Sequence, residues 1–295
     1  MTKIVALSAP FPGVCRVLEE ASKLGLLELV KLDSDRVKIP PADVYILGAW
    51  HPTYTQIVKV LEGSRVGVLW TSSVGETQFE PIEQDYLAAI ITNPAIEFVW
   101  FGDESLGEVW EKGFYAPYPM KLPEECIKRE KQDIVTLFCP ATAKKNILNQ
   151  LIAVALLQRK HGSLVLHTNV PVDPAFAQSI KLKYVQHGWL QEQEYRELIA
   201  SSKLNFAVSW AETLNYQSAE AALLGTVSIT SATIPWFSPW YELDVPPNSS
   251  IDIASLADEM LERREWWGEK AFKSAVDYFE NSNRLLEQAL SRLTS

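Results

Sequence analysis

The sequence predicts an α/β protein built from two domains, each with a parallel sheet covered by helices on both faces. Short apolar runs alternate with helical patterns along the chain, and strands buried on both faces take the form of nearly continuous apolar runs. The alternation stops at a proline-rich and then charged stretch, residues 113–133, and restarts after it, as expected of a linker between domains. The length of 295 residues also suits two domains of roughly 100–200 residues. We therefore expect two Rossmann-like domains facing each other across a cleft, with ligands at the carboxyl ends of the strands.

Each half of the chain is predicted to alternate strands with helices. In the first half, the expected strands are 3–8, 27–32, 44–47, 65–70 and 96–101, and the expected helices are 16–24, 55–61 and 81–91. In the second half, the expected strands are 133–138, 164–168, 183–185, 205–208 and 226–230, and the expected helices are 145–160, 192–201 and 216–224. Residues 253–293 are predicted to be mostly helical, with a break near 281–283.

Two boundaries follow from this pattern. We place the first domain at 1–125, the second at 126–275, and a C-terminal helix at 276–295 that can pack back on the first domain. A single large domain is the alternative that length alone leaves open.

The composition excludes several classes of protein. Hydrophobic residues make up 47% of the chain and charged residues 22%, as in folded rather than disordered proteins. The net charge of −10 argues against non-specific binding of nucleic acid, which depends on cations that neutralise phosphates. Cys15, Cys126 and Cys139 are too few and too scattered for a disulfide scaffold or a structural zinc site. The chain opens on a predicted buried strand rather than a signal peptide, and no apolar run approaches the ~20 residues of a membrane span, so we expect a cytoplasmic protein.

The segment 205–225 carries the strongest functional pattern. It is predicted to form a strand, a polar loop with Glu212, a helix with Glu220 and a terminating glycine, Gly225. A helix start has unpaired backbone N–H groups that bind anions such as phosphate. Glu220 lies about 8–12 Å further along the helix, a spacing that suits a carboxylate binding the hydroxyls of a ribose. The alternative is that Glu212 is a favourable charge near a helix start and Glu220 a solvated residue, although the neighbours of Glu220 are apolar.

The same residues resemble a known motif. Ser209-x-x-Glu212-x7-Glu220, followed by Ala-Ala-Leu-Leu-Gly225, is similar to the E-x7-E motif of retaining GT-B glycosyltransferases, particularly glycosyltransferase family 4. The resemblance covers residues 134–231, whereas the first half of the chain matches only in the rhythm of its elements. It implies a GT-B fold and a hexosyltransferase-type enzyme. Such an enzyme moves a sugar from a nucleoside-diphosphate sugar, such as a UDP- or GDP-sugar, with retention.

The resemblance also implies roles for individual residues. Glu220 would bind the ribose of the donor nucleotide, Glu212 would lie near the transferred sugar, and Lys145 would neutralise the leaving diphosphate. The backbone that would hold the diphosphate belongs to Thr213, Leu214 and Asn215.

The two lysines at the start of helix 145–160 have a physical argument of their own. Lys144 and Lys145 carry positive charge where a helix start disfavours it, and a bound anion would reverse that sign. The alternative is a pair of solvated lysines. The family usually has an arginine six residues before the lysine, but this chain has Cys139 there, and a cysteine supplies no fixed cation. Either Lys144 replaces it, or a basic group such as Arg16 comes from the first domain, or diphosphate stabilisation is weaker.

Weaker candidates complete the predicted site. Gly13, in the loop after the first strand, and Gly188, in a turn before helix 192–201, could let donor phosphate or base approach. For Gly13, a plain turn between strand and helix is an equally good explanation. His51 follows strand 44–47 and is loosely similar to an active-site histidine of the family, with a surface histidine as the alternative. The aromatic cluster 236–241 could stack on sugar, touch a membrane or pack between domains.

No cofactor and no metal ion is expected, because cations and helix N–H groups can stabilise a departing diphosphate. The expected partners are a nucleotide-sugar donor and a glycan, lipid or small-molecule acceptor, with peripheral membrane contact left open. Two alternatives remain: a GT-B-like module that binds a nucleotide or glycan without turnover, and a sugar-nucleotide epimerase.

Overall fold

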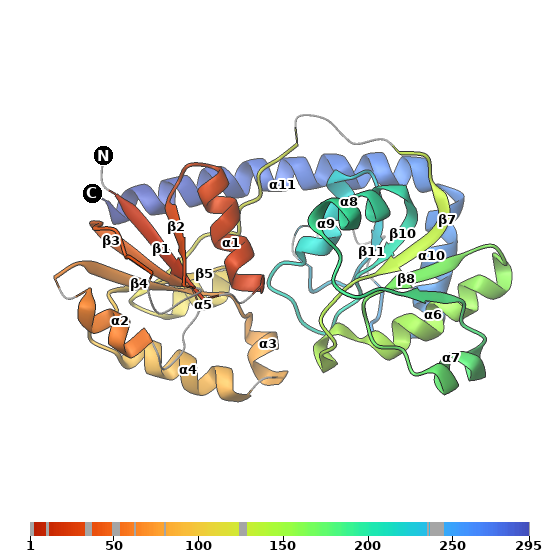
Figure 1. The fold of residues 1–295 in the computed structure, drawn as a ribbon, viewed down its shortest axis with the longest axis horizontal. Helices are drawn as coiled ribbons and strands as arrows, with labels where there is room; N and C mark the ends of the chain where they lie inside the picture. The colour runs from red at the N-terminus through yellow and green to blue at the C-terminus, as the bar shows by residue number, and fades with distance from the viewer. Residues whose placement is uncertain are drawn as a thin grey trace. The chain divides into compact units, whose positions relative to one another are not determined.

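The computed structural model describes residues 3–9, 12–32, 37–48, 54–61, 63–79, 81–123, 129–234, 236 and 245–294. They divide into two compact units (Figure 1). The first consists of Met1–Leu122 and Phe279–Ser295, and the second of Pro123–Tyr278. Both are α/β units, as the sequence predicts. In the described part of the chain, no helix is both long and apolar enough to cross a membrane.

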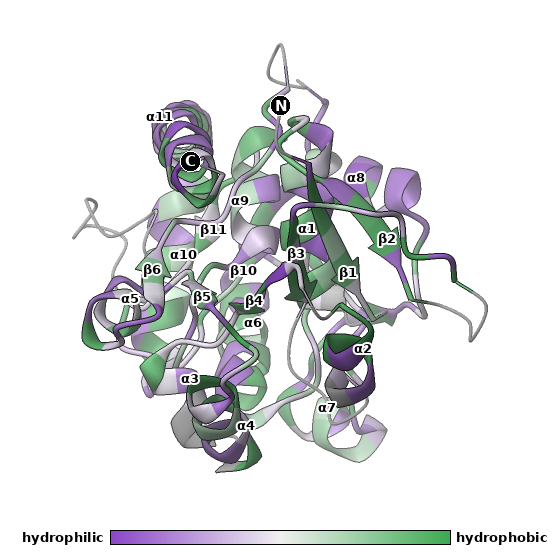
Figure 2. Cartoon of the chain, turned by 90° about the vertical axis from the view of Figure 1, so that its left-hand side faces the viewer, coloured by the Kyte–Doolittle hydropathy of each residue, from purple (hydrophilic) through white to green (hydrophobic). Residues whose placement is uncertain are grey.

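The first unit is a six-stranded sheet in which every pairing is parallel. The strand order is β2-β1-β3-β4-β5-β6. The strands are β1 (Ile4–Ser8), β2 (Glu28–Lys31), β3 (Val44–Gly48), β4 (Arg65–Trp70), β5 (Phe98–Phe101) and β6 (Gly113–Tyr115). The helices are α1 (Pro12–Lys23), α2 (Tyr54–Val60), α3 (Val74–Phe79), α4 (Pro81–Thr92) and α5 (Glu104–Val109). Strands β1 and β3 are wholly buried and hydrophobic (Figure 2), which is why the sequence shows them as unbroken apolar runs.

The second unit is a five-stranded parallel sheet in the order β11-β10-β7-β8-β9. Helices α8 and α9 lie on one face and α6 on the other (Figure 1). The strands are β7 (Gln132–Leu137), β8 (Val165–Thr168), β9 (Tyr184–Gln186), β10 (Ser202–Phe206) and β11 (Ser228–Ile229). The helical elements are η1 (Ala143–Lys145), α6 (Ile147–Lys160), α7 (Pro174–Ile180), α8 (Glu192–Ser201), α9 (Tyr216–Leu223), α10 (Ser250–Glu262) and α11 (Arg264–Leu293).

Helix α11 runs from the second unit into the first, where its last part is anchored. The predicted break at 281–283 is wrong, and the helix instead begins after Arg263, which ends α10. Asn283 does not interrupt the helix because its side chain bonds the backbone of Met120, accepting from the N–H at 3.1 Å and donating to the oxygen at 2.9 Å. Asn283, which resembles a helix-stop signal in the sequence, therefore forms a tertiary contact with Met120 instead.

Short elements were not predicted because their signals are local and weak. Strand β6 lies in the stretch expected to be linker, and pairing with β5 makes it a strand. Helix α7 begins with the N-cap Asp173 followed by Pro174, and ends at Lys181 in the left-handed conformation. Helix α1 begins at Pro12 rather than near residue 16, since proline is well suited to a first helical turn.

Gly67 in β4 gives a test of the first unit's packing. A methyl group at this position would overlap the ring of Phe98 on the neighbouring strand. We expect Gly67→Ala to destabilise the unit by about 1–3 kcal/mol, the usual cost of overpacking. The measurement is urea unfolding followed by tryptophan fluorescence.

Gly13→Ala is the control, because its added methyl group would meet no atom within 4 Å. Its unfolding midpoint should stay near that of the unmodified protein. Equal midpoints for the two variants would contradict the packing described for β4.

Candidate functional site

The second sheet reverses its direction of winding between β7 and β10, which are neighbours in the sheet although β8 and β9 separate them in the chain. At such a reversal the loops after the two strands leave toward opposite faces, and α/β proteins bind ligands in the space between them. The loop 138–146 follows β7, and the loop 207–215 follows β10. The strongest candidates from the sequence lie on these two loops.

The structure brings Lys145 and Glu212 together as an ion pair. Lys145 ends η1, and its side chain is 13% exposed, whereas that of Glu212 is 4% exposed. The same carboxylate oxygen, Oε1, accepts from Ser209 Oγ at 2.8 Å and from Asn215 Nδ2 at 3.1 Å. Three donors therefore converge on one oxygen, so that a nearly buried carboxylate is held by charge and by hydrogen bonds.

A buried amide holds the two loops in register. Gln150, in α6, is 1% exposed. It donates from Nε2 to the backbone oxygen of Lys145 at 2.7 Å and accepts from the N–H of Val208 at 2.9 Å. A backbone bond from Trp210 N to Lys144 O, 2.8 Å long, joins the same loops. Neither contact was predicted, because both join segments that are distant in the sequence.

Helix α9 begins at Tyr216, three residues beyond Thr213, which follows Glu212, and carries Glu220. Its N-cap Asn215 accepts from the N–H of Ser218 at 2.9 Å, and Gly225, at φ 71°, follows its end, as predicted from the sequence. Glu220 is half-buried on this helix, next to the buried Ala219 and Ala221.

The three residues predicted to hold a diphosphate lie immediately before α9. Thr213 and Asn215 are buried and Leu214 is half-buried. Asn215 has two roles, because its side chain caps the helix and also donates to Glu212.

Cys139, where the resemblance leads us to expect an arginine, is part of the same cluster. Burial raises the pKa of the Cys139 thiol to about 12, the charge of Lys145 opposes the rise and the charge of Glu212 adds to it. The thiol is therefore neutral at pH 7 and contributes no positive charge. Its backbone N–H donates to Asn169 Oδ1 at 3.0 Å, which fixes the start of the loop after β7.

The other cations considered for a diphosphate have different surroundings. Lys144 is half-buried in η1. Arg16, in the first unit, pairs with Glu20 at 3.2 Å. Glu20 is 2% exposed and also binds Lys23 at 2.8 Å and the N–H of Lys121 at 2.7 Å. Arg16 thus belongs to a network that ties α1 to the chain leaving β6.

A pair of histidines lies toward the same edge of the sheet, with His167 near the end of β8 and His187 directly after β9. His187 Nε2 and His167 Nδ1 are 3.0 Å apart, and the ring of His187 lies 5.9 Å from that of Phe138. Burial lowers the pKa of His167, and the neighbouring His187 lowers it further. Gly188 follows this pair, is exposed, and would place a Cβ within 4 Å of no atom. The sequence shows both histidines near strand ends but not that they meet.

The candidates of the first unit are less well defined. Gly13 lies exposed in the first turn of α1 rather than in a loop, and a Cβ there would meet no atom within 4 Å. His51 lies outside the described residues. Trp236 is 1% exposed and donates from Nε1 to Ser218 Oγ at 3.2 Å. This tryptophan therefore packs on α9, while the rest of the aromatic cluster lies outside the described residues.

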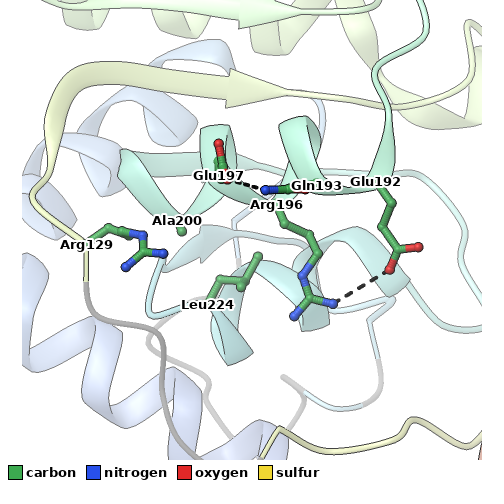
Figure 3. A pocket seen from close by; sticks show the side chains of 7 residues that line it. All are labelled: Arg129, Glu192, Gln193, Arg196, Glu197, Ala200 and Leu224. Carbon is green, nitrogen blue, oxygen red and sulfur yellow. Dashed lines mark hydrogen bonds and ion pairs between the residues drawn. The ribbon is translucent and has the colours of Figure 1, made fainter.

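A cavity of ≈ 410 Å³ lies along α8 and beside the end of α9, and none of the predicted site residues lines it (Figure 3). Two pairs of its polar side chains bind each other, with Arg196 Nη1 and Glu192 Oε1 3.7 Å apart and Gln193 donating to Glu197 at 3.0 Å. The lining residues are Arg129, Glu192, Gln193, Arg196, Glu197, Ala200 and Leu224. Within the described ranges, no three His, Cys, Asp or Glu side chains gather as a metal-binding group.

No protein-family model matches the sequence, and no curated protein matches it significantly. Solved structures do match. A mutant of TarM from S. aureus, in complex with fondaparinux, α-GlcNAc-glycerol and UDP, superposes with a TM-score of 0.69 at 14% identity. That match covers 85% of this chain and 55% of TarM, so the chain spans about half the length of that protein.

Two further structures match over nearly the whole of both chains. A UDP-forming α,α-trehalose-phosphate synthase from Burkholderia xenovorans has a TM-score of 0.68 at 10% identity, with 100% of each chain covered. An E. coli structure described as trehalose-6-phosphate bound with UDP-2-fluoro glucose has a TM-score of 0.65 at 11% identity, covering 98% of this chain and 99% of that one. The fold is GT-B. At these identities the likeness extends to the fold, and the GT-B expectation from the sequence is confirmed at that level.

The raised pKa of Cys139 leads to a chemical test. Because the thiolate is the reactive form of cysteine, a pKa of about 12 leaves about one ten-thousandth of the thiol ionised at pH 8, compared with about a quarter at the ordinary pKa of 8.5. We expect iodoacetamide at pH 8 to alkylate Cys139 at least about a hundredfold more slowly in the folded protein than in urea. Mass spectrometry of the Cys139 peptide gives both rates.

The urea-unfolded protein serves as the control, since burial is lost there. Equal rates in the folded and unfolded states would contradict a protected, neutral thiol beside Lys145 and Glu212.

Proposed function

We propose that the chain is a glycosyltransferase that moves a sugar, of the hexosyl type, from a nucleoside-diphosphate sugar to an acceptor, with retention. The observation that carries the proposal is the meeting of Lys145 and Glu212 across the reversal of the second sheet. Helix α9, with Glu220, begins directly beside this pair. A cation, a helix start and a carboxylate further along the same helix are what a diphosphate with an attached ribose requires.

In this proposal the second domain binds the donor and the first binds the acceptor, with residues 276–295 returning to the first. Glu220 binds the ribose, and the backbone of 213–215 holds the diphosphate. Lys145 balances the negative charge that collects on the diphosphate as the sugar leaves, and Glu212 lies near the transferred sugar. Charge stabilisation by groups already in place is the largest contribution in many enzymes, so the reaction needs no metal ion.

The matched structures support the choice of donor. TarM was solved with UDP, and another matched structure holds UDP-2-fluoro glucose. We infer a UDP-sugar as the first donor to test, followed by GDP-sugars. For the acceptor we propose only a broad class, a glycan, lipid or small molecule bearing a hydroxyl group.

Cys139 favours a second candidate, a GT-B module that binds the donor without turnover. Its neutral thiol stands where the resemblance leads us to expect a phosphate-binding arginine, so the leaving group has less positive charge around it. Incubation with labelled UDP-, GDP- and ADP-sugars separates the possibilities. Transfer or hydrolysis supports the enzyme, binding without either supports the module, and an altered sugar released from donor alone indicates an epimerase.

Replacement of Glu220 tests the donor site directly. We expect Glu220→Ala to weaken binding of the UDP-sugar by about 10–100-fold, since hydrogen bonds to a charged group contribute about 1.5–3 kcal/mol. Isothermal titration calorimetry gives the affinity. Glu259→Ala is the matched control, because this glutamate is exposed on α10, and it should bind donor as the unmodified protein does. Unchanged affinity in Glu220→Ala would refute the assignment of this helix.

Gln150 bridges the loops that follow β7 and β10, and we call this contact the Gln150 brace. Its effect on donor binding can be tested by comparison with Gln158, a similar residue on the same helix. Gln158 is also buried in α6 and makes two hydrogen bonds, of 2.8 and 2.9 Å, with the backbone of Lys183. Substituting leucine at either position removes two hydrogen bonds to the backbone, each of which contributes about 0.5–1.5 kcal/mol. We expect Gln150→Leu and Gln158→Leu to lower the thermal midpoint similarly, but only Gln150→Leu to weaken donor binding.

The reason is that Gln150 joins the loops that carry Lys145 and Glu212, whereas Gln158 joins α6 to the start of β9. Equal donor affinities in the two variants would show that the brace contributes stability but does not position the site.

A further inference from the structure

We propose that Glu212 is a built-in counterion of Lys145, and that a nucleoside diphosphate binds by displacing this carboxylate from the lysine. The inference rests on the proposed function, because it concerns how the donor enters that site. The inference adds two points to that function. The charge of Lys145 is already neutralised by Glu212 before the donor binds, and Glu212 lowers donor affinity because it competes with the diphosphate for the lysine.

The first reason is the state of Lys145 itself. Its ammonium group is largely buried, and its side chain bonds Glu212 Oε1. A lysine ammonium has three donor positions but a single charge. A diphosphate that approached while the pair was intact would meet a carboxylate beside the cation, and like charges at close range in a poorly solvated site repel strongly. The lysine must therefore exchange one anion for the other.

The second reason is the way in which Glu212 is held. Ser209 and Asn215 bond the same oxygen as the lysine does, at 2.8 and 3.1 Å. Both donors are neutral and both belong to the loop of Glu212, so they remain with the carboxylate when Lys145 moves toward a diphosphate. Glu212 can thus leave the lysine without becoming a buried charge with no partner, which would be costly.

The third reason is the charge of the surroundings. The charges of both Lys145 and Glu212 act on the thiol of Cys139, and this thiol is neutral. An arginine in this place would leave positive charge in excess, so that an anion could bind without displacing anything. With a cysteine, the cluster of Cys139, Lys145 and Glu212 carries no net charge, and the positive charge becomes available through exchange.

The test is nucleotide affinity after removal of the competitor. We expect Glu212→Gln to bind UDP about five- to thirtyfold more tightly than the unmodified protein, and to bind inorganic pyrophosphate more tightly as well. Titration calorimetry measures both ligands. The rate of donor hydrolysis or transfer should fall in the same variant, because Glu212 lies near the reacting sugar, so KM for the donor and kcat decrease together.

Glu259→Gln is the control for net charge. It removes one negative charge from an exposed position on α10 and should leave UDP affinity unchanged. UDP affinity in Glu212→Gln that equals or falls below that of the unmodified protein overturns the inference. A gain of equal size in Glu259→Gln also overturns it, since the effect would then come from the overall charge.

Two further measurements separate a loss of folding from a change in nucleotide affinity. Circular dichroism establishes that Glu212→Gln is folded, and Glu212→Asp, which keeps the charge but withdraws it from Lys145, should give a smaller gain of the same sign. A failure of the unmodified protein to bind UDP, GDP or ADP overturns the proposed function and this inference with it. Binding by the unmodified protein with no gain in either variant overturns the inference alone.

Discussion

The candidate site depends on one constraint, the parallel pairing of β7 and β10 across the point where the second sheet reverses its winding. These strands are distant in the chain, and their pairing places the loops that follow them side by side. Gln150 and the bond between Trp210 and Lys144 then fix how the loops face each other. Without this pairing, Lys145 and Glu212 would be unrelated surface residues, and α9 would present its first turn to solvent alone.

An ion pair as buried as Lys145–Glu212 is weak grounds for a role in stability. Removing two charges from water costs several kcal/mol, and apolar residues of similar size often do as well or better in such places. The site compensates with Ser209 and Asn215, which bond the carboxylate. Groups kept at such a cost indicate a role other than stabilising the fold, and at the reversal of an α/β sheet that role is most often to bind a ligand.

Much of the fold could be predicted because its strongest signals are local. The segment from β10 to Gly225 contains its own strand, N-cap and C-cap, and its helix was predicted to within one residue. Contacts between distant segments give no such local signal in the sequence. The pairing of Lys145 with Glu212, the bridge through Gln150 and the meeting of His167 with His187 follow from strand order, and alternating apolar runs do not reveal strand order.

The prediction of short elements failed for a related reason. β6 is a strand because β5 pairs with it, and its own three residues carry little preference. Asn283 is the opposite case. Its local sequence signals a helix stop, but its tertiary contact with Met120 keeps it within the helix. In both cases the neighbour decides the conformation, and the neighbour is not visible in the local sequence.

Lys145 and Arg16, two of the cations considered for a diphosphate, share one property. Lys145 is paired with Glu212, and Arg16 is paired with the buried Glu20. These are two of the positive charges that the sequence offered for a diphosphate, and each already has a carboxylate partner. The two pairs differ in one respect. Arg16 and Glu20 lie one turn apart on α1, whereas Lys145 and Glu212 come from loops that follow different strands. The other donors to Glu212 lie on its own loop, so they stay with the carboxylate in the exchange proposed for Lys145, and the position six residues before Lys145 holds a neutral Cys139 in place of a permanent cation. Of the two paired cations, we therefore infer that the one beside α9 exchanges its partner.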